Sequence, residues 1–425
     1  MQNLMKNREI KNSGITLMAL VITIIILLIL AGISLNMLAG NNGVINHAGK
    51  AKNLTENAEE KEILEIATLN AIGKNKYGNI EEEKLKEALS NEDVTIKKSG
   101  KNFNVTFNKS SRKYKIKSNG DIKYYEEIPA TDIYAKLESD GTLKLRATKL
   151  DGYEKGTKWN SPDILKVVIE EPIAPKTCYG MFDSCTNLTS FENIENLHTE
   201  NATSMYYMFY NCKNLETLDV SNFDTGKVQT MQCLFCNCSS LKSLDLSNFD
   251  TQNVTTMYRM FESCGNITEL DLSGFNTSKV NNMSWMFLYC KSLYNLNLKN
   301  LDTSSVTRMI YMFGGCRSLK AIDVSSFNTS KLEDMSMMFN GCSGLVNVDL
   351  SNFDTQNVTN MNAMFRSCGN LSNASLNSML NMCKKATKIS DKTLTYVEVP
   401  KAKALVCNTL DNYSSFVESG WSIGY

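Results

Sequence analysis

The chain has 425 residues, in which 45 Lys and Arg balance 45 Asp and Glu, and 42% of the residues are hydrophobic. This length accommodates two or three ordinary domains. A net charge of zero provides no electrostatic attraction to nucleic acid, so no nucleic-acid partner is expected. The chain contains only two His residues, which argues against histidine-based catalysis and against zinc binding.

The N-terminal segment predicts a single membrane-spanning helix. Residues 15–38 carry no formal charge, and as a helix they would extend roughly 36 Å, enough to cross a bilayer core of about 30 Å. The preceding leader, residues 1–14, contains Lys6, Arg8 and Lys11 against one acidic residue. The positive-inside rule keeps this leader in the cytoplasm and exports the chain beyond the helix. We therefore expect a single-pass protein of the cell membrane with an extracellular C-terminal region.

The junction between the leader and the helix suggests processing. Residues 13–17 read Ser-Gly-Ile-Thr-Leu, directly before an unbroken apolar run. This junction resembles the prepilin cleavage and methylation site of type IV pilins and pseudopilins. The resemblance implies a prepilin peptidase as a partner, with cleavage after Gly14 and N-methylation of Ile15. Most of that family has Phe at the position of Ile15 and Glu at that of Ala19, so the resemblance supports cleavage more directly than filament assembly. An anchor that is never cut is the alternative.

Residues 39–127 predict a small α+β module. Apolar residues set among Glu and Lys extend the anchor as a partly amphipathic helix, and a second short helix is expected at 81–89. Three short segments predict strands, the last two joined by a turn at Asn119-Gly120: 103–107, 113–117 and 122–124. A long helix followed by a small antiparallel sheet is how pilin subunits are built. The module therefore resembles a pilin.

The second half of the chain is an internal repeat. A Met-Phe pair, replaced once by Leu-Phe, recurs every 26 residues from Met208-Phe209 to Met364-Phe365, and Met181-Phe182 precedes the first by 27. Each Phe is followed three positions later by a Cys: Cys185, Cys212, Cys238, Cys264, Cys290, Cys316, Cys342 and Cys368. A fixed period of this length indicates a solenoid.

One repeat, residues 239–264, shows the coil that we expect. Leu244 and Leu246 alternate with polar residues and predict a short strand. Five apolar residues at helical spacing predict a helix, which Asp250 or Thr251 can cap: Val254, Met257, Met260, Phe261 and Cys264. The expected fold class is therefore α/β, a leucine-rich-repeat-type solenoid of strand-plus-helix repeats of 26 residues. The N-terminal transmembrane helix and the pilin-like module precede it.

The repeat pattern M-F-x-x-C-x-x-L-x-x-L-D-L-S-N-F-D-T-x-x-V-x-x-M resembles the BspA-like leucine-rich repeat of bacterial surface proteins. The resemblance covers residues 177–381 and implies adhesion to a host or matrix protein or to a glycan. Leucine-rich repeats bind many unrelated partners, so the fold alone does not name the ligand. Because an open solenoid exposes its apolar core, we expect a linker and cap hairpin at 128–176 and a C-terminal cap at 382–425.

The repeated Cys column has two interpretations. Neighbouring thiols would lie roughly 5 Å apart, but parallel side chains rarely meet the dihedral angle of a disulfide. Small buried thiols are therefore favoured. Cys233 and Cys236 form a separate cluster with Cys238, which suggests metal or redox chemistry. The positions that match Cys233 in other repeats are predicted to face outward, and no second CxxC or nearby His is present, so incidental thiols are favoured and we assign no metal site.

The repeat period also predicts two outward columns. Asp residues recur at one strand position, where they either bind cations or are solvated by neighbouring Ser and Asn, the interpretation that we favour. A second column carries Tyr207, Arg259, Trp285 and Tyr311 and is a candidate contact surface. No catalytic or cofactor-binding set is present, so we expect no enzyme. The predicted function is surface binding; the alternative is a minor pilin or pseudopilin that acts in filament or secretion-apparatus assembly.

Overall fold

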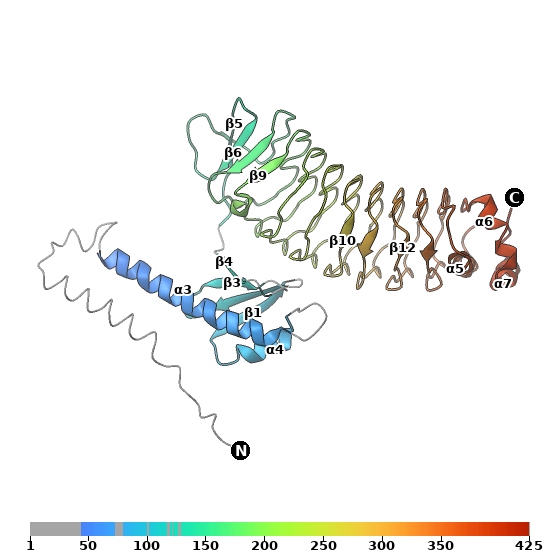
Figure 1. Ribbon diagram of the computed structural model, residues 1–425, viewed down its shortest axis with the longest axis horizontal. Coiled ribbons are helices and arrows are strands. Elements are labelled where there is room, and N and C mark those ends of the chain that lie inside the picture. The colour runs from blue at the N-terminus through green and yellow to red at the C-terminus, as the bar shows by residue number, and fades with distance from the viewer. Residues whose placement is uncertain are drawn as a thin grey trace, which may run out of the picture. The chain divides into compact units, whose positions relative to one another are not determined.

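The structure is a computed structural model that describes residues 44–72, 80–99, 102–116, 120, 122–125 and 129–424. The chain divides into an N-terminal unit, which holds the first helices, and a C-terminal unit, which holds the repeats (Figure 1). Gly14, Ile15 and the predicted membrane helix at 15–38 lie outside the described residues. Within the described ranges, no helix is both long and apolar enough to cross a membrane.

Two helices and a four-stranded sheet precede the repeats, close to where the sequence predicts them. Helix α3 spans Val44–Ala71 and α4 spans Glu82–Ala88. The strands follow in the spatial order β1-β2-β3-β4: β1 (Val94–Ser99), β2 (Asn102–Phe107), β3 (Lys113–Ile116) and β4 (Ile122–Tyr125). Strand β1 was not predicted. Glu60 of α3 accepts a hydrogen bond from the Tyr114 hydroxyl at 2.9 Å and pairs with Arg112 at 3.2 Å, so α3 is joined to β3.

A hairpin lies where the sequence predicts one before the repeats, and it begins the solenoid. Strand β5 (Tyr134–Leu137) pairs antiparallel with β6 (Thr142–Arg146), and the short β7 (Glu154–Lys155) pairs with the other side of β5. Strands β8 (Lys166–Ile169) and β9 (Ser190–Glu192) then add in parallel next to β6. A 3₁₀ turn, η1 (Ile194–Asn196), follows β9. The change from antiparallel to parallel pairing starts the coiling of the chain.

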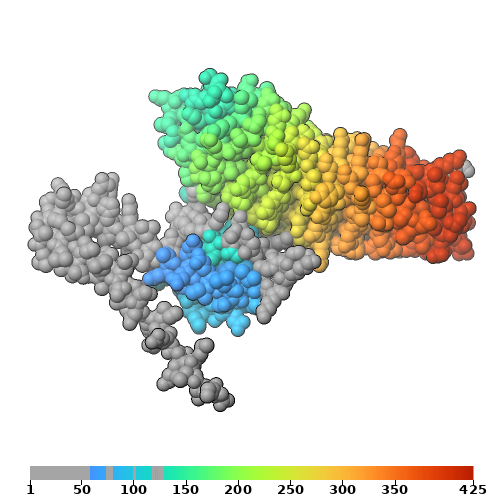
Figure 2. All heavy atoms as spheres, viewed as in Figure 1, coloured from blue at the N-terminus to red at the C-terminus, as the bar shows by residue number. Residues whose placement is uncertain are grey.

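The repeats stack as coils in register, which confirms the predicted solenoid. A continuous line of parallel bridges joins positions 26 residues apart: Ser204, Thr230, Thr256, Asn282, Arg308, Asp334 and Asn360. On another side, β10 (Glu269–Asp271) pairs in parallel with β11 (Asn295–Asn297), and β12 (Ala321–Ile322) with β13 (Asn347–Val348). The repeated Phe rings stack through the core, from Phe182 to Phe365, with centroids 5.5–5.9 Å apart. The coils follow one another without interruption from green to red in Figure 2.

The prediction of a helix in each repeat is wrong. Around Met208-Phe209, residues Tyr207 and Asn211 have φ angles of 59° and 65°, in the left-handed region that interrupts an α-helix. The N–H groups of alternate residues point to the next coil, as that of Phe209 does when it donates to Leu234 O at 3.0 Å. The N–H of Cys212 donates instead within its own coil, to Phe209 O at 3.3 Å. The repeats are therefore strands and consecutive turns, not strand-plus-helix units of an α/β fold.

A helical cap follows the last full repeat. Helix α5 (Asn373–Cys383) begins inside the range 177–381 that the sequence predicts for the repeats, and Ser372 caps its N-terminus by accepting a hydrogen bond from Ser375 N. Short turns of helix complete the chain: α6 (Lys401–Ala404), η2 (Cys407–Thr409) and α7 (Tyr413–Glu418). The N–H groups of Ala363 and Phe365 donate to Tyr396 O and Val397 O. The cap thus supplies the partners that a further coil would otherwise provide.

Candidate binding surface

The buried Cys and Thr side chains that recur along the solenoid hydrogen-bond to the backbone of neighbouring coils. They are therefore not available to bind a ligand. The repeated thiols that follow each Phe by three positions donate to the carbonyl of a Phe one coil earlier, at 2.9–3.2 Å: Cys212, Cys238, Cys264, Cys290, Cys316, Cys342 and Cys368. All these thiols are free and buried, as the preferred interpretation predicted. The hydrogen bond to the Phe carbonyl was not predicted from the sequence.

The Thr that follows each Asp or Asn turn joins two coils through its hydroxyl. Thr251 Oγ1 donates to Asn276 O at 2.9 Å and accepts from Asn276 N at 2.8 Å. The same two hydrogen bonds recur at Thr225 and Thr303, with Asp250 and Asn328 as partners. The sequence predicts either Asp250 or Thr251 as a helix cap. Since no helix follows it, the hydroxyl bridges backbone groups of successive coils instead.

The outward Asp column is held by local hydrogen bonds, as the favoured interpretation predicted. At each position, a side-chain oxygen accepts the N–H of the residue two positions later, at 2.8–3.1 Å: Asp219, Asp245, Asp271, Asn297, Asp323 and Asp349. The hydrogen bonds from Ser325 hold the pKa of Asp323 below its usual value. These carboxylates therefore stabilise the turns that end the strands.

The remaining column lies at the turn side of the coils and forms a surface that we name the aromatic edge. It comprises the partly exposed aromatic side chains of five coils together with one arginine: Tyr179, Tyr206, Tyr207, Tyr210, Tyr258, Arg259, Trp285 and Tyr311. The predicted outward column of Tyr207, Arg259, Trp285 and Tyr311 lies within it. These four residues all have φ angles between 52° and 62°, which project their side chains from the turn.

The aromatic edge contains two clusters of side chains in direct contact. In the first, the Tyr206 and Tyr207 rings stack with centroids 4.1 Å apart, and Tyr210 meets Tyr207 at 4.7 Å. A hydrogen bond with Tyr206, followed by burial, raises the pKa of Tyr207. In the second, the Arg259 guanidinium lies 3.7 Å from the centroid of the Trp285 ring. This cluster combines a cation with an aromatic face, a contact typical of recognition surfaces.

Cys233 and Cys236 lie between the two clusters, and one expectation about them is wrong. Cys233 shares the column of Tyr207 and Arg259, but its side chain is only 1% exposed. The small thiol is covered because its neighbours in that column are large. Among the described residues, no group of His, Cys, Asp and Glu side chains is arranged to hold a metal ion.

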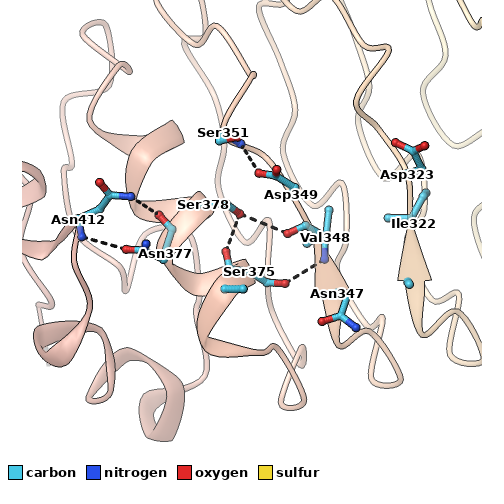
Figure 3. Close-up of a pocket in the computed structure, with 12 residues that line it drawn as sticks. Ile322, Asp323, Asn347, Val348, Asp349, Ser351, Ser375, Asn377, Ser378 and Asn412 are labelled. Atoms are coloured by element: carbon cyan, nitrogen blue, oxygen red, sulfur yellow. Dashed lines mark hydrogen bonds between the residues drawn. The ribbon is translucent and has the colours of Figure 1, made fainter.

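A polar hollow lies on the strand side, between the last coils and the C-terminal cap (Figure 3). Its polar groups are largely engaged with one another. Ser375 Oγ accepts from Val348 N at 2.9 Å, and Asn377 Oδ1 accepts from Asn412 N at 2.9 Å. Asp349 accepts from Ser351 N. Because these bonds join β13 to α5, and α5 to the segment that precedes α7, we assign the hollow to the joint between solenoid and cap. We take the aromatic edge as the candidate binding surface.

Comparison with known proteins bears on the repeats. Residues 176–292 and 264–379 match a family model described as "Mycoplasma protein of unknown function, DUF285". A solved leucine-rich repeat protein from Eubacterium ventriosum is 15% identical, over 56% of this chain and 93% of that one, with a TM-score of 0.24. No curated protein matches the chain. The repeat array is a solenoid of stacked coils, and its sequence is similar to that of the DUF285 repeat family.

Proposed function

We propose that this chain is a bacterial cell-surface protein, anchored in the membrane by residues 15–38, whose solenoid binds a protein or glycan partner without catalysing a reaction. The aromatic edge is the observation that supports binding most directly. Aromatic residues and Arg are enriched in the parts of interfaces that contribute most to affinity. The similarity of residues 176–379 to a bacterial repeat family supports the same proposal.

The backbone beneath the aromatic edge is rigid, which favours the binding of a partner. Each coil is hydrogen-bonded to its neighbours through alternate N–H groups, so Trp285 and Tyr311 project from a rigid support. A preorganised surface loses little conformational entropy on binding. The aromatic edge runs over six successive coils, of which the third carries Cys233. Five spacings of roughly 4.8 Å amount to about 24 Å, which suits a protein or an oligosaccharide better than a small metabolite.

Binding by the aromatic edge is tested with cells that produce the full chain, on surfaces coated with collagen, a matrix protein, or with mucin, a glycoprotein. We expect adhesion to one coating, and we expect the double substitution Trp285→Ala with Tyr311→Ala to reduce it at least tenfold. Tyr294→Ala is the matched control, since Tyr294 is 54% exposed but lies outside the aromatic edge. Equal adhesion of the double variant and the wild type would contradict the assignment of the surface.

The membrane anchor and its processing are a further part of the proposal. We infer that a prepilin peptidase cleaves after Gly14 and methylates Ile15, because a basic leader meets an uncharged apolar run at this junction. Mass spectrometry of the mature N-terminus from a membrane fraction tests this. A methylated Ile15 is the expected result, and an intact Met1 would contradict it.

The alternative function is that of a minor pilin or pseudopilin in filament or secretion-apparatus assembly. The observation that favours it is the 28-residue helix α3 followed by the sheet of β1 to β4. Under this alternative the protein is recovered with filaments sheared from the cell. Under the leading proposal it stays in the membrane fraction after shearing, and the aromatic-edge substitutions affect adhesion alone.

A further inference from the structure

Cys233 and Cys236 differ from the column thiols in position and in partner. The column thiols donate to Phe carbonyls inside the core, as Cys238 does to Phe209 O at 3.1 Å. Cys236 Sγ instead lies 3.5 Å from Glu262 Oε2, a side chain of the next coil, on the aromatic edge. The repeats on either side carry Tyr207 with Tyr210 and Arg259 with Glu262 at the same two positions. Cys233 and Cys236 therefore do not belong to the column of thiols that hydrogen-bond one coil to the next.

The backbone places the two cysteines at the ends of one turn. Cys236 N donates to Cys233 O at 3.3 Å, the hydrogen bond that closes a four-residue turn. The ends of such a turn lie within about 7 Å of each other, and a disulfide needs Cα atoms about 4.4–6.8 Å apart. The turn thus brings the sulfur atoms together without any change of fold.

The cover over this pair consists of edge side chains. Cys233 and Cys236 are each 1% exposed, whereas the neighbouring Tyr207 and Tyr210 are partly exposed. Displacement of a tyrosine at the surface would open the pair. The column thiols could be reached only by separating coils, since each one is fully buried and is bonded to a carbonyl of the preceding coil. The CxxC pair is consequently the most accessible pair of adjacent thiols in the described repeats.

We propose that Cys233 and Cys236 form a reversible dithiol–disulfide pair that exchanges with low-molecular-weight disulfides at the aromatic edge. Cys233 gives its proton to solvent and attacks one sulfur of the small disulfide, which forms a mixed disulfide and releases one small thiolate. Cys236 then gives its proton to Glu262, the nearest acceptor, and attacks Cys233 Sγ. The second small thiolate leaves and takes up the proton from Glu262. Two electrons pass from the two cysteine sulfurs to the small disulfide, one S–S bond forms and one breaks.

The surroundings of Cys236 suit it to the second step. Its hydrogen bond with Cys233, then burial and the charge of Glu262, raise its pKa, so it remains a thiol while Cys233 reacts. Burial raises the pKa of Glu262, which makes this carboxylate a stronger base. Arg259 Nε lies 3.4 Å from Glu262 Oε2 and its guanidinium lies over Trp285. Oxidation removes the thiol that Glu262 accepts from, and so alters the contacts of Arg259 on the aromatic edge.

The pair is tested on the full-length protein, incubated with glutathione disulfide, denatured, alkylated and digested with trypsin. The peptide from Val228 to Lys242 contains Cys233, Cys236 and Cys238. We expect it to carry one disulfide between Cys233 and Cys236, with Cys238 alkylated, and to carry three alkylated thiols after treatment with dithiothreitol. Three alkylated thiols after oxidation, a stable glutathione adduct on the wild type, or a bond that includes Cys238 would each overturn the proposal. This result does not depend on the proposed binding function.

Two variants test the order of the steps. Cys236→Ser should stop at the mixed disulfide and retain one glutathione on Cys233, because the resolving thiol is absent. Glu262→Gln, which conserves shape, should reach the same disulfide with at least a threefold slower second step. Failure of Cys236→Ser to trap glutathione on Cys233 would overturn the assigned attacking thiol. An unchanged rate in Glu262→Gln would overturn the role of the carboxylate, and the wild-type mass spectrum stands even if a variant fails to fold.

Discussion

The thiol of Cys264 donates a hydrogen bond to the backbone carbonyl of Phe235, one coil earlier, over 3.1 Å. The same carbonyl accepts the N–H of Cys238 at 3.1 Å, within its own coil. Each column Cys therefore closes a turn with its N–H and reaches back to the preceding coil with its Sγ. This double role gives a physical reason for a Cys three residues after every Phe, since the site requires a small side chain that can also donate.

Replacement of a column thiol should destabilise the solenoid. Cys264→Ala removes the donor to Phe235 O and leaves a small cavity at a fully buried position. We expect a loss of about 1–2 kcal/mol in the free energy of unfolding, measured by chemical denaturation. Cys264→Ser keeps a hydrogen-bond donor of similar size. If the hydrogen bond contributes to stability, the Ser variant should lose less unfolding free energy than the Ala variant. An Ala variant as stable as the wild type would show that the contact is incidental.

The period of the solenoid and its columns could be predicted from the sequence, but the local conformation of the turns could not. Met257, Met260 and Phe261 have the i, i+3, i+4 spacing of a helix, and consecutive turns of three or four residues produce the same spacing. The sequence does contain one signal of these turns. The residue before the repeated Cys is often Asn or Gly, as at Asn211 and Gly341, and these types readily adopt a left-handed conformation.

The candidate surface was predicted in part. The column of Tyr207, Arg259, Trp285 and Tyr311 can be derived from the repeat period alone, because equivalent positions of a solenoid share one side. The burial of Cys233 cannot be derived from that period, since it depends on the size of the neighbouring side chains. The hydrogen bond from Cys236 to Glu262 likewise requires the offset between two coils, which a one-dimensional pattern does not contain.

The Thr bridges should contribute more than ordinary surface hydroxyls. Thr251→Val keeps the side-chain shape and removes both hydrogen bonds to Asn276, so a backbone N–H and a C=O lose a partner at a buried site. We expect a loss of about 2–3 kcal/mol in unfolding free energy. Thr255→Val is the matched control, because its hydroxyl bond to Gln229 O is exposed to solvent. Similar losses in both variants would contradict a special role for the bridge.

One glycine is required by the close approach of two coils. A Cβ atom added at Gly344 would lie 2.2 Å from Arg317 O, a backbone atom that cannot move independently of its coil. Gly344→Ala should therefore destabilise the protein by on the order of 3 kcal/mol or prevent its accumulation. Gly369→Ala provides the control, since a Cβ there meets no atom within 4 Å. Melting temperatures followed by circular dichroism compare the two, and an unaffected Gly344→Ala protein would refute the packing argument.

The buried thiols should make the protein sensitive to alkaline pH. Burial raises the pKa of Cys238 and of Cys368 to about 12, from an ordinary value of 9.0. Below pH 9 both the folded and the unfolded chain keep these thiols protonated, so stability does not change. Between pH 9 and 12 the unfolded chain loses their protons while the folded chain retains them, which favours unfolding.

Each such thiol should reduce the unfolding free energy by about 1.4 kcal/mol at one pH unit above its unfolded pKa. Denaturation measured from pH 7 to pH 10 with a reducing agent should show a steep loss that begins near pH 9. Cys238→Ala removes one of the titrating groups, so its decline should be shallower than that of the wild type. Parallel declines in the two proteins would mean that other groups, such as exposed Tyr or Lys residues, cause the effect, and that the pKa of Cys238 does not differ between the folded and the unfolded chain.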